Sequence, residues 1–340
     1  MSNGTILVTG GAGYIGSHVV KQLLNQGRKV VVLDDLSTGF CQSVLGAELI
    51  VGSTGDAVLV SQTLAQHTIG AVMHFAAHTI VPESVSNPLK YYKNNTCSSR
   101  TLLNCCADQG IEHFIFSSTA AVYGMPAGGL AREDSPLSPI NPYGTSKLMT
   151  EWMLRDLSAA TALRHVVLRY FNVAGCDTDG LIGQSTRHAT LLTKVACEAA
   201  VGKREKVLIF GTDYDTHDGT GVRDYIHVED LADAHLKALT YLENGGESST
   251  FNCGYGHGYS VREVLKMVEK VNGAPLNIEE MPRRAGDPPQ LIADASRIRA
   301  TLGWTPVHDN LETIVTTALN WEKRLLTDDF RDPITTRGHS

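Results

Sequence analysis

Short apolar, β-branched runs alternate with longer segments of helical period along the first half of the chain. The apolar runs predict strands at residues 5–9, 29–34, 71–77, 113–118 and 164–171. Between them, apolar positions that recur every three or four residues predict helices at 17–26, at about 89–108 and from Asn141 onward. Continuous apolar strands separated by helices are typical of a parallel sheet covered on both faces. We therefore expect an α/β fold with a doubly wound parallel sheet of the Rossmann type.

This alternation loosens beyond about residue 175. A glycine-rich loop at 211–221 interrupts it, and shorter helical patterns follow at about 229–242 and 260–271. These features predict a smaller C-terminal α+β lobe, from which a strand or helix can return to the main sheet. The expected domains are residues 1–175 for the Rossmann sheet, 176–330 for the smaller lobe and 331–340 for a tail.

Composition narrows the class of protein. The chain has 340 residues, 42% hydrophobic and 19% charged, as in an ordinary soluble globular protein. Its formal net charge of −7 argues against sequence-independent binding to nucleic acid. The first residues carry no basic, apolar leader, and no apolar stretch reaches the roughly 20 residues of a membrane span, so we expect no membrane partner. Seven cysteines without a Cys-x-x-Cys pair favour free thiols and a cytoplasmic location.

A glycine-rich turn, "TGGAGYIG", joins the first predicted strand to the first predicted helix. It places Gly10, Gly13 and Gly16 where a tight turn and a close backbone approach are needed, and the helix start offers free N–H groups to a pyrophosphate. Asp34 ends the second predicted strand, 34 − 16 = 18 residues after the last glycine. An acid there accepts hydrogen bonds from ribose hydroxyls and repels a 2′-phosphate. This pattern predicts NAD, rather than NADP, as the cofactor.

The stretch "NPYGTSK" at residues 141–147 pairs a phenol with an ammonium group. Asn141 and Pro142 favour a helix start, so Tyr143 and Lys147, four residues apart, share one helix face. Such a pair on its own is more often an exposed surface pair. Here it follows a predicted strand that ends in hydroxyl side chains, including Thr119, at the edge where open parallel sheets bind ligands.

Together, the glycine turn, the strand-end hydroxyl and Tyr-x-x-x-Lys resemble the short-chain dehydrogenase/reductase superfamily. The length and the second lobe resemble its extended branch, which acts largely on nucleotide sugars. Physical chemistry supports a catalytic Tyr143: lowering a tyrosine pKa from about 10 to 7 takes roughly 4 kcal/mol. One positive charge about 6 Å away contributes roughly 2.8 kcal/mol at an effective dielectric constant of about 20. Lys147 and an oxidised nicotinamide together are then sufficient to lower the pKa of Tyr143 to about 7. Thr119 can share the substrate proton.

Within this superfamily, the block "IFGTDYDTHDGTGVRDYIHVEDLADAH" closely resembles that of the UDP-glucose 4-epimerases. Further matches are "GGAGYIGSH", "HFAA", "VPESVSNPLKYYKNN", "RYFNVAG", "PRRAGD" and "ADAS". The resemblance implies catalytic roles for Tyr143, Lys147 and Thr119. It implies cofactor contacts from Gly10, Gly13, Tyr14, Ile15, Gly16, Asp34, Asp35, Ser37, Ser53, Thr54, Phe75, Ala76, Ala77, Thr79, Asn94, Tyr143, Lys147 and Phe171. It implies UDP-sugar contacts from Thr119, Tyr143, Asn172, Phe210, Arg223, Arg284, Asp287 and Leu291.

The implied reaction is the redox-neutral interconversion of UDP-galactose and UDP-glucose through a 4-keto intermediate, with tightly bound NAD. Two arginines suit a diphosphate, because each guanidinium can make bidentate charge-assisted hydrogen bonds. Related nucleotide-sugar dehydratases follow the active-site threonine with an Asp-Glu pair; Ala120 and Ala121 here argue against dehydration. The family also implies a homodimer, formed through two helices of each subunit.

Several positions depart from the usual epimerase pattern. Ser53 and Thr54 replace an expected acidic and apolar pair after the third strand, Thr79 replaces a frequent lysine, and Leu191 replaces an Asn or His. Leu291 stands where some narrow-specificity epimerases carry a tyrosine, which leaves room for a 2-acetamido group. UDP-GlcNAc/UDP-GalNAc are therefore alternative substrates. A separate alternative is another epimerase or a decarboxylase of the extended family that acts on a UDP-pentose or a UDP-uronate.

A different class of protein, a non-catalytic NAD-binding sensor, usually loses the Tyr or the Lys, and both are present here. We predict no metal site. The loop at 213–219 lacks the glycine position and the closing Glu of a calcium loop. His74 and His78 flank the end of a predicted strand and do not share a helix face.

Overall fold

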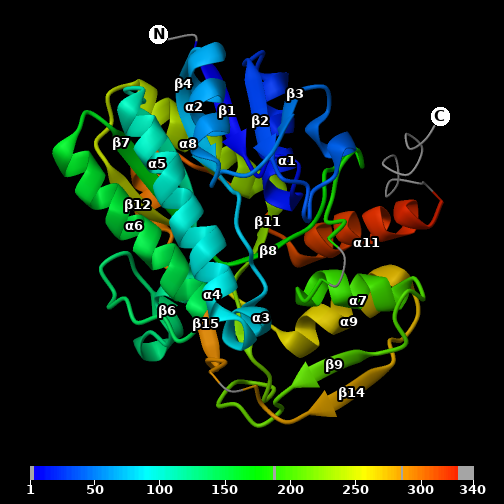
Figure 1. The fold of residues 1–340 in the computed structure, drawn as a ribbon. Helices are drawn as coiled ribbons and strands as arrows, with labels where there is room; N and C mark the ends of the chain where they lie inside the picture. The colour runs from blue at the N-terminus through cyan, green and yellow to red at the C-terminus, as the bar shows by residue number, and fades with distance from the viewer. Residues whose placement is uncertain (1–3, 187–188, 285, 328–340) are drawn as a thin grey trace.

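A seven-stranded parallel sheet forms the centre of the protein (Figure 1). The computed structural model describes residues 4–186, 189–284 and 286–327. The strand order is β12-β7-β5-β4-β1-β2-β3, and every neighbouring pair is parallel, which confirms the expected Rossmann-type α/β fold. The strands are β1 (Thr5–Thr9), β2 (Val30–Asp34), β3 (Glu48–Val51), β4 (Ile69–His74), β5 (His113–Thr119), β7 (Arg164–Tyr170) and β12 (Ser249–Cys253).

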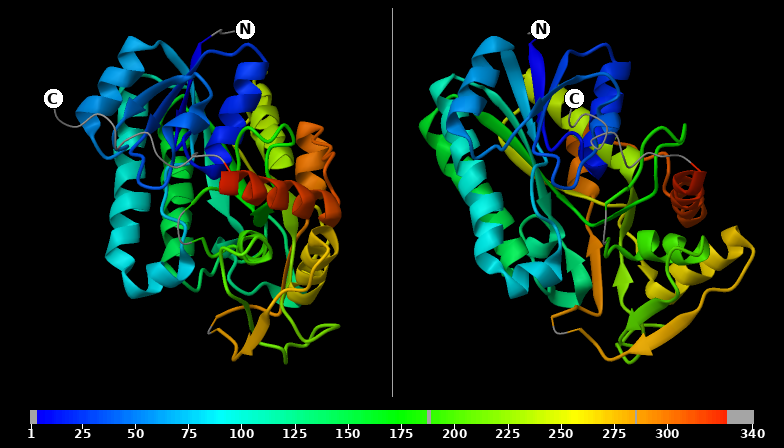
Figure 2. Two further views of the ribbon diagram at one scale, coloured as in Figure 1. Left: turned by 90° about the vertical axis from the view of Figure 1, so that its right-hand side faces the viewer. Right: turned by 45° about the vertical axis from the view of Figure 1, so that its right-hand side comes forward.

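Helices cover both faces of this sheet because successive strand residues point to opposite sides. Ile6 and Val8 of β1 join one apolar cluster, whereas Leu7 between them joins the other. The first cluster includes α1 (Tyr14–Asn25) and α8 (Val228–Glu243). The second includes α2 (Ala57–Gln66), α5 (Ser98–Asp108) and α6 (Pro142–Ala160). The left view of Figure 2 shows the sheet between these two layers.

Three predicted elements differ from the observed ones at their ends. The first helix begins at Tyr14, directly after the glycine turn, and β4 stops at His74 where the chain leaves the sheet. The predicted helix at about 89–108 is a succession of α4 (Pro88–Tyr91), a π-helical turn η2 (Tyr92–Cys97) and α5, preceded by α3 (Val81–Ser86). Within η2, the buried side chain of Asn95 bonds to both backbone groups of His78. This local hydrogen bonding is not visible in an apolar pattern.

The second half of the chain contributes both to the sheet and to a lobe below it (Figure 1). β12 pairs with β7 in the main sheet, and α8 packs against α1. Small sheets β14-β9, β13-β10-β15-β6 and β11-β8 lie outside the main sheet. Their strands, and the remaining helices, are β6 (Leu130–Ala131), β8 (Asn172–Ala174), α7 (Leu192–Ala200), β9 (Val207–Phe210), β10 (Val222–Arg223), β11 (Tyr225–His227), β13 (Tyr259–Ser260), α9 (Val261–Asn272), β14 (Ile278–Met281), β15 (Gln290–Ala293), α10 (Ser296–Leu302) and α11 (Leu311–Thr327), with 3₁₀ turns η1 (Cys41–Val44), η3 (Ala120–Val122) and η4 (Ala127–Gly129).

The predicted domain boundaries stay predictions, and the expected tail at 331–340 lies outside the described residues. Within the described ranges, none of the helices combines the length and apolar character that crossing a bilayer would require.

The strand order reverses between β1 and β4, and the two strand ends lie close together there. The N–H of Phe75 donates to the carbonyl of Thr9 at 2.9 Å. Gly10 follows with φ +72°, and a Cβ at this position would lie 2.6 Å from the backbone nitrogen of Ala76. A crevice at such a reversal is where open α/β sheets bind ligands. Gly10 is therefore required both by its backbone conformation and by the close approach of the next strand end.

A pair of glycine variants separates these two requirements. Gly27 has nearly the same φ, +70°, but a Cβ there would meet nothing within 4 Å. We expect Gly27→Ala to lower the free energy of unfolding by about 1–2 kcal/mol through backbone strain alone. Gly10→Ala should lose an additional 1–3 kcal/mol or so, because the added methyl overpacks the strand ends. Urea unfolding of both variants measures the difference, and equal losses would contradict the close approach.

Candidate active site

The glycine turn leaves the start of α1 open to a ligand. Gly13 is the N-cap residue and contributes no side-chain hydrogen bond, so the first N–H groups of the helix are not capped. A Cβ on Gly16 would collide with the carbonyl oxygen of Gly10, which explains this third glycine. The side chain of Tyr14 turns away, and its hydroxyl donates to the carbonyl of Gly175 at 2.6 Å. Only the backbone of Tyr14 thus remains for a phosphate.

Asp34 is fixed against this turn. Its carboxylate accepts the N–H of Ala12 at 2.9 Å and that of Leu36 at 2.8 Å. Burial raises the pKa of Asp34, while these two hydrogen bonds oppose the rise. Each carboxylate oxygen keeps a lone pair beyond these bonds, so Asp34 can still accept ribose hydroxyls.

The other predicted cofactor residues differ in their exposure. Asp35 is exposed and accepts both the N–H and the hydroxyl of Ser37. After β3, Ser53 is exposed and Thr54 is buried. Ile15 lies in the first turn of α1 and is partly buried, as are Phe75, Ala76, Ala77 and Asn94, whereas Thr79 is exposed.

The three predicted catalytic residues come together at the carboxyl end of β5. The side chain of Asn141 caps α6 by accepting the N–H of Gly144 at 2.9 Å. A Cβ on Gly144 would lie 2.6 Å from the carbonyl oxygen of Ala121, so this glycine lets α6 start against the end of β5. Tyr143, in the first turn of α6, is 8% exposed and shares a side-chain hydrogen bond with Thr119.

Lys147 is almost completely buried one helical turn later. Its Nζ donates to the carbonyl of Ser117 at 2.8 Å and lies 5.0 Å from the centroid of the Phe116 ring. Burial lowers the pKa of Lys147 to about 7, opposed by the charge of Glu151. Burial likewise raises the pKa of Tyr143, opposed by the hydrogen bond with Thr119. Burial thus favours the neutral form of both groups, so an ionised Tyr–Lys pair would require compensating charges nearby.

The predicted substrate residues form a second group in and around the smaller lobe. The guanidinium of Arg284 lies 3.6 Å from the centroid of the Phe210 ring, at the end of β9. Arg223 of β10 is in register with Leu291 of β15, and Leu291 packs against the buried cluster that contains Phe171. The remaining two are Asn172, partly buried in β8, and Asp287, exposed in the loop before β15.

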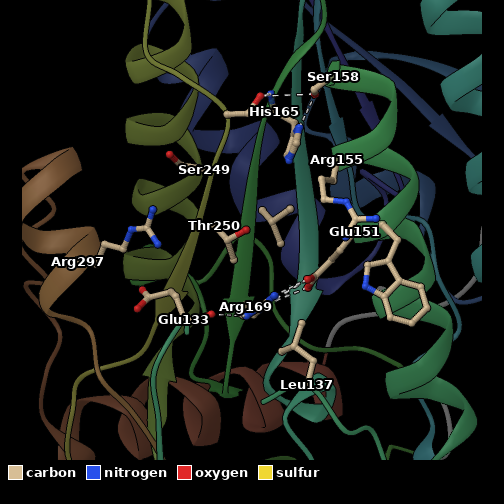
Figure 3. A pocket seen from close by; sticks show the side chains of 13 residues that line it. Glu133, Leu137, Glu151, Arg155, Ser158, His165, Arg169, Ser249, Thr250 and Arg297 are labelled. Atoms are coloured by element: carbon tan, nitrogen blue, oxygen red, sulfur yellow. Dashed lines mark hydrogen bonds and ion pairs between the residues drawn. The ribbon is translucent and has the colours of Figure 1, made fainter. Parts of the chain in front are cut away.

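A buried polar network behind α6 was not predicted. The Glu151 carboxylate accepts a hydrogen bond from the hydroxyl of Ser118 and forms a bidentate ion pair with Arg169. Arg169 also donates a hydrogen bond to the hydroxyl of Tyr123. Figure 3 shows Glu151 and Arg169 of this network in the wall of a cavity of about 430 Å³. Glu151 follows Lys147 by four residues, so its place on the same helix face was the signal in the sequence.

One cluster among the described residues has the composition of a metal site. Side-chain atoms of His227, Glu229 and His308 lie within 4.8 Å of one another. Both ring nitrogens of His227 already have partners, since Nδ1 accepts the N–H of Glu229 and Nε2 contacts the hydroxyl of Thr317. No lone pair of His227 is then free for a metal ion. His74, considered from the sequence, instead bonds to hydroxyl groups on both sides.

Comparison with known proteins agrees with this geometry. Residues 6–254 match the model of the NAD dependent epimerase/dehydratase family. The UDP-glucose 4-epimerase of Azospirillum brasilense is 56% identical over 321 residues, covering 94% of this chain and 92% of that protein.

Two solved structures are also similar. A UDP-glucose 4-epimerase of Brucella ovis in complex with NAD is 41% identical, with a TM-score of 0.91 and coverage of 94% of this chain and 98% of that one. A UDP-Glc/GlcNAc 4-epimerase of Campylobacter jejuni is 49% identical, with a TM-score of 0.83 and coverage of 94% and 99%. From the matched sheet, glycine turn and Tyr–Lys pair, we conclude that this chain belongs to the NAD dependent epimerase/dehydratase family.

Proposed function

We propose that the protein is an NAD-dependent UDP-glucose 4-epimerase, which interconverts UDP-galactose and UDP-glucose. The observation that carries this function is the burial of Tyr143, Lys147 and Thr119 together at the end of β5. The relatives of similar length and sequence carry the same activity in their names. A phenol and an ammonium buried side by side suit proton transfer at a substrate hydroxyl.

The crevice between β1 and β4 fits NAD. Gly10 and Gly16 lack the methyl groups that would fill the turn, and the uncapped start of α1 provides N–H donors for a pyrophosphate. Asp34 would hold the adenosine ribose and repel a 2′-phosphate. When bound, NAD supplies the acceptor and then the donor of the hydride, so no external oxidant is consumed.

The smaller lobe supplies charge for a UDP group. Among the described residues, Arg223 and Arg284 form no ion pair with a carboxylate, whereas the adjacent Arg283 is paired with Asp213. An arginine without a carboxylate partner is available for a diphosphate. Firm binding of UDP there leaves the sugar free to turn between the two half-reactions.

At the sugar, the chain's own residues handle the proton. Tyr143 removes the proton of the 4-hydroxyl as C4 gives up its hydride, and Thr119 accepts or shares the same hydrogen bond. The Lys147 ammonium stabilises the tyrosinate. After the 4-keto sugar presents its other face, Tyr143 returns the proton, and the configuration at C4 is inverted.

Conversion of UDP-galactose to UDP-glucose by purified protein tests this function. We expect activity without added NAD, because the cofactor is retained. Tyr143→Phe should abolish conversion, since it removes the hydroxyl that carries the proton. Lys147→Met should lower kcat about 100-fold, the equivalent of roughly 2.8 kcal/mol of lost charge stabilisation.

Bound NAD, measured by absorbance after denaturation, is the control for these variants. Conversion that survives in Tyr143→Phe would remove this residue as the base. A wild-type protein that binds NAD but converts no UDP-sugar would support the sensor alternative.

Leu291 favours UDP-GlcNAc as a second substrate. Its side chain is smaller than tyrosine, and one similar structure is a UDP-Glc/GlcNAc 4-epimerase. We expect the wild-type protein to convert UDP-GlcNAc. Leu291→Tyr should lower that conversion at least about tenfold, because the tyrosine ring fills the space of the acetamido group, while turnover of UDP-glucose persists. Parallel assays with both sugars measure the ratio; an unchanged ratio would contradict the role of Leu291.

We also propose a homodimer, with α5 and α6 of each subunit in the interface. These helices lie side by side on one face (Figure 1), and Trp152 of α6 is 44% exposed. Sedimentation should give about twice the chain mass of 36.7 kDa, and Trp152→Glu should shift it toward one chain. A monomeric wild-type protein would contradict this proposal.

We place the protein in the cytoplasm, where seven free thiols stay reduced; recovery from the secreted fraction would contradict that location.

A further inference from the structure

Three functional groups share one face of α6. Tyr143, Lys147 and Glu151 follow at intervals of four residues, so each lies one helical turn beyond the previous one. The first two belong to the proposed catalytic machinery. Glu151 is only 6% exposed and lies one helical turn beyond Lys147. A buried carboxylate is costly unless it is paired, so its retention here calls for a physical account.

Adjacent residues of β5 hold the lysine and the glutamate. The carbonyl of Ser117 accepts the Lys147 ammonium at 2.8 Å, and the hydroxyl of Ser118 donates to Glu151 at 2.5 Å. On the next strand, Arg169 donates to both carboxylate oxygens of Glu151, with Nη2 at 2.6 Å from Oε2. Figure 3 shows Arg169 reaching Glu151 across the cavity wall. The two strands therefore fix the carboxylate relative to the ammonium.

The charges around Lys147 are otherwise few. His74 of β4 faces the ammonium, but burial and Lys147 itself lower the pKa of this histidine to about 3, so it is neutral. Tyr91 and Tyr170 lie near Tyr143, and burial raises the pKa of both phenols. These side chains contribute no charge at neutral pH.

Glu151 is thus the group whose negative charge opposes the burial of Lys147. The positive charge of Arg169, on the far side of the carboxylate, reduces this effect without cancelling it. Glu133 also lines the cavity, but its side chain accepts the N–H of Asn252, and it meets Arg169 only through its carbonyl.

We propose that Glu151 is a positioning residue for the reaction: held by Ser118 and Arg169, its carboxylate keeps the Lys147 ammonium charged one helical turn from Tyr143. This inference rests on the proposed epimerase function. Glu151 acts through Lys147 and contacts neither the substrate nor the cofactor.

The pH profile of UDP-galactose conversion tests the proposal. In Glu151→Gln, Lys147 loses its proton at lower pH and Tyr143 gains less stabilisation as an anion. We expect the alkaline limb of kcat to move down by about one unit, with kcat lowered at least tenfold and KM within about threefold. Glu133→Gln is the matched control, since it removes the same charge from the same cavity, and it should keep the wild-type limbs.

Arg169→Gln should move the alkaline limb of the kcat profile in the opposite direction. Without its arginine, the Glu151 carboxylate acts on Lys147 at full strength, so the alkaline limb should move up. A purely structural network would instead lower kcat in both variants without moving the limbs in opposite directions. Unmoved limbs in Glu151→Gln would overturn the proposal. Thermal unfolding of each variant checks that the protein is folded.

The cavity permits a test by chemical rescue. Its volume of about 430 Å³ adjoins Glu151 and readily admits formate. We expect Glu151→Ala to lose conversion and to recover at least tenfold on addition of formate, while Glu133→Ala and Tyr143→Phe do not respond. Absence of recovery in a folded Glu151→Ala protein would count against a carboxylate role.

If Glu151→Gln does not fold, Glu151→Asp decides. The aspartate retains the negative charge but holds it one methylene further from Ser118. The proposal therefore expects a pH profile of kcat close to that of the wild type, with a smaller loss of kcat. A profile displaced as far as that of a variant with a neutral side chain would refute it. Failure of the proposed function is distinguishable, because the wild-type protein itself would then convert no UDP-galactose.

Discussion

A buried ammonium group is the constraint on which the site depends. Lys147 lies inside the protein between α6 and β5, where burial alone favours its neutral form. A strand-end carbonyl accepts its hydrogen bond, and the buried Glu151 carboxylate opposes the effect of burial on its pKa. Gly144 permits the approach of α6 to the end of β5, and the Asn141 cap fixes where the helix begins. The backbone geometry of one helix start thus sets the chemistry of the phenol beside it.

The parallel sheet gives this arrangement its fixed frame. Alternate residues of each strand enter opposite apolar clusters, so the strand ends cannot shift without disturbing both layers. The reversal between β1 and β4 opens the crevice for a dinucleotide, and the next strand ends carry Thr119 and the lysine contact. The residues proposed to bind the cofactor and those proposed to move protons therefore share one edge of one rigid element.

Much of this could be read from the sequence. Periodicity predicted five of the seven strands of the main sheet and most of its covering helices, but not β3, β12 or α2. Helical spacing paired Tyr143 with Lys147, and the predicted strand end brought in Thr119. Local features were less visible: the π-helical turn depends on Asn95 bonding to His78, and the end of β4 depends on contacts with Thr9. The Ser118–Glu151–Arg169 network required tertiary structure, because its members come from β5, α6 and β7. The roles of individual cofactor and substrate residues rest on resemblance, since no ligand fixes them.

The edge strand β12 has a consequence for how the protein forms. It pairs with β7, although about eighty residues separate them along the chain. The side-chain oxygen of Asn252 in β12 accepts a hydrogen bond from the hydroxyl of Tyr123, and that hydroxyl accepts one from Arg169. During synthesis, Tyr143 and Lys147 leave the ribosome long before β12, the strand that completes the polar network behind them. Such distant pairing slows folding, so the nascent Rossmann core must wait, with an open sheet edge and an unfinished charge network, for the second half of the chain.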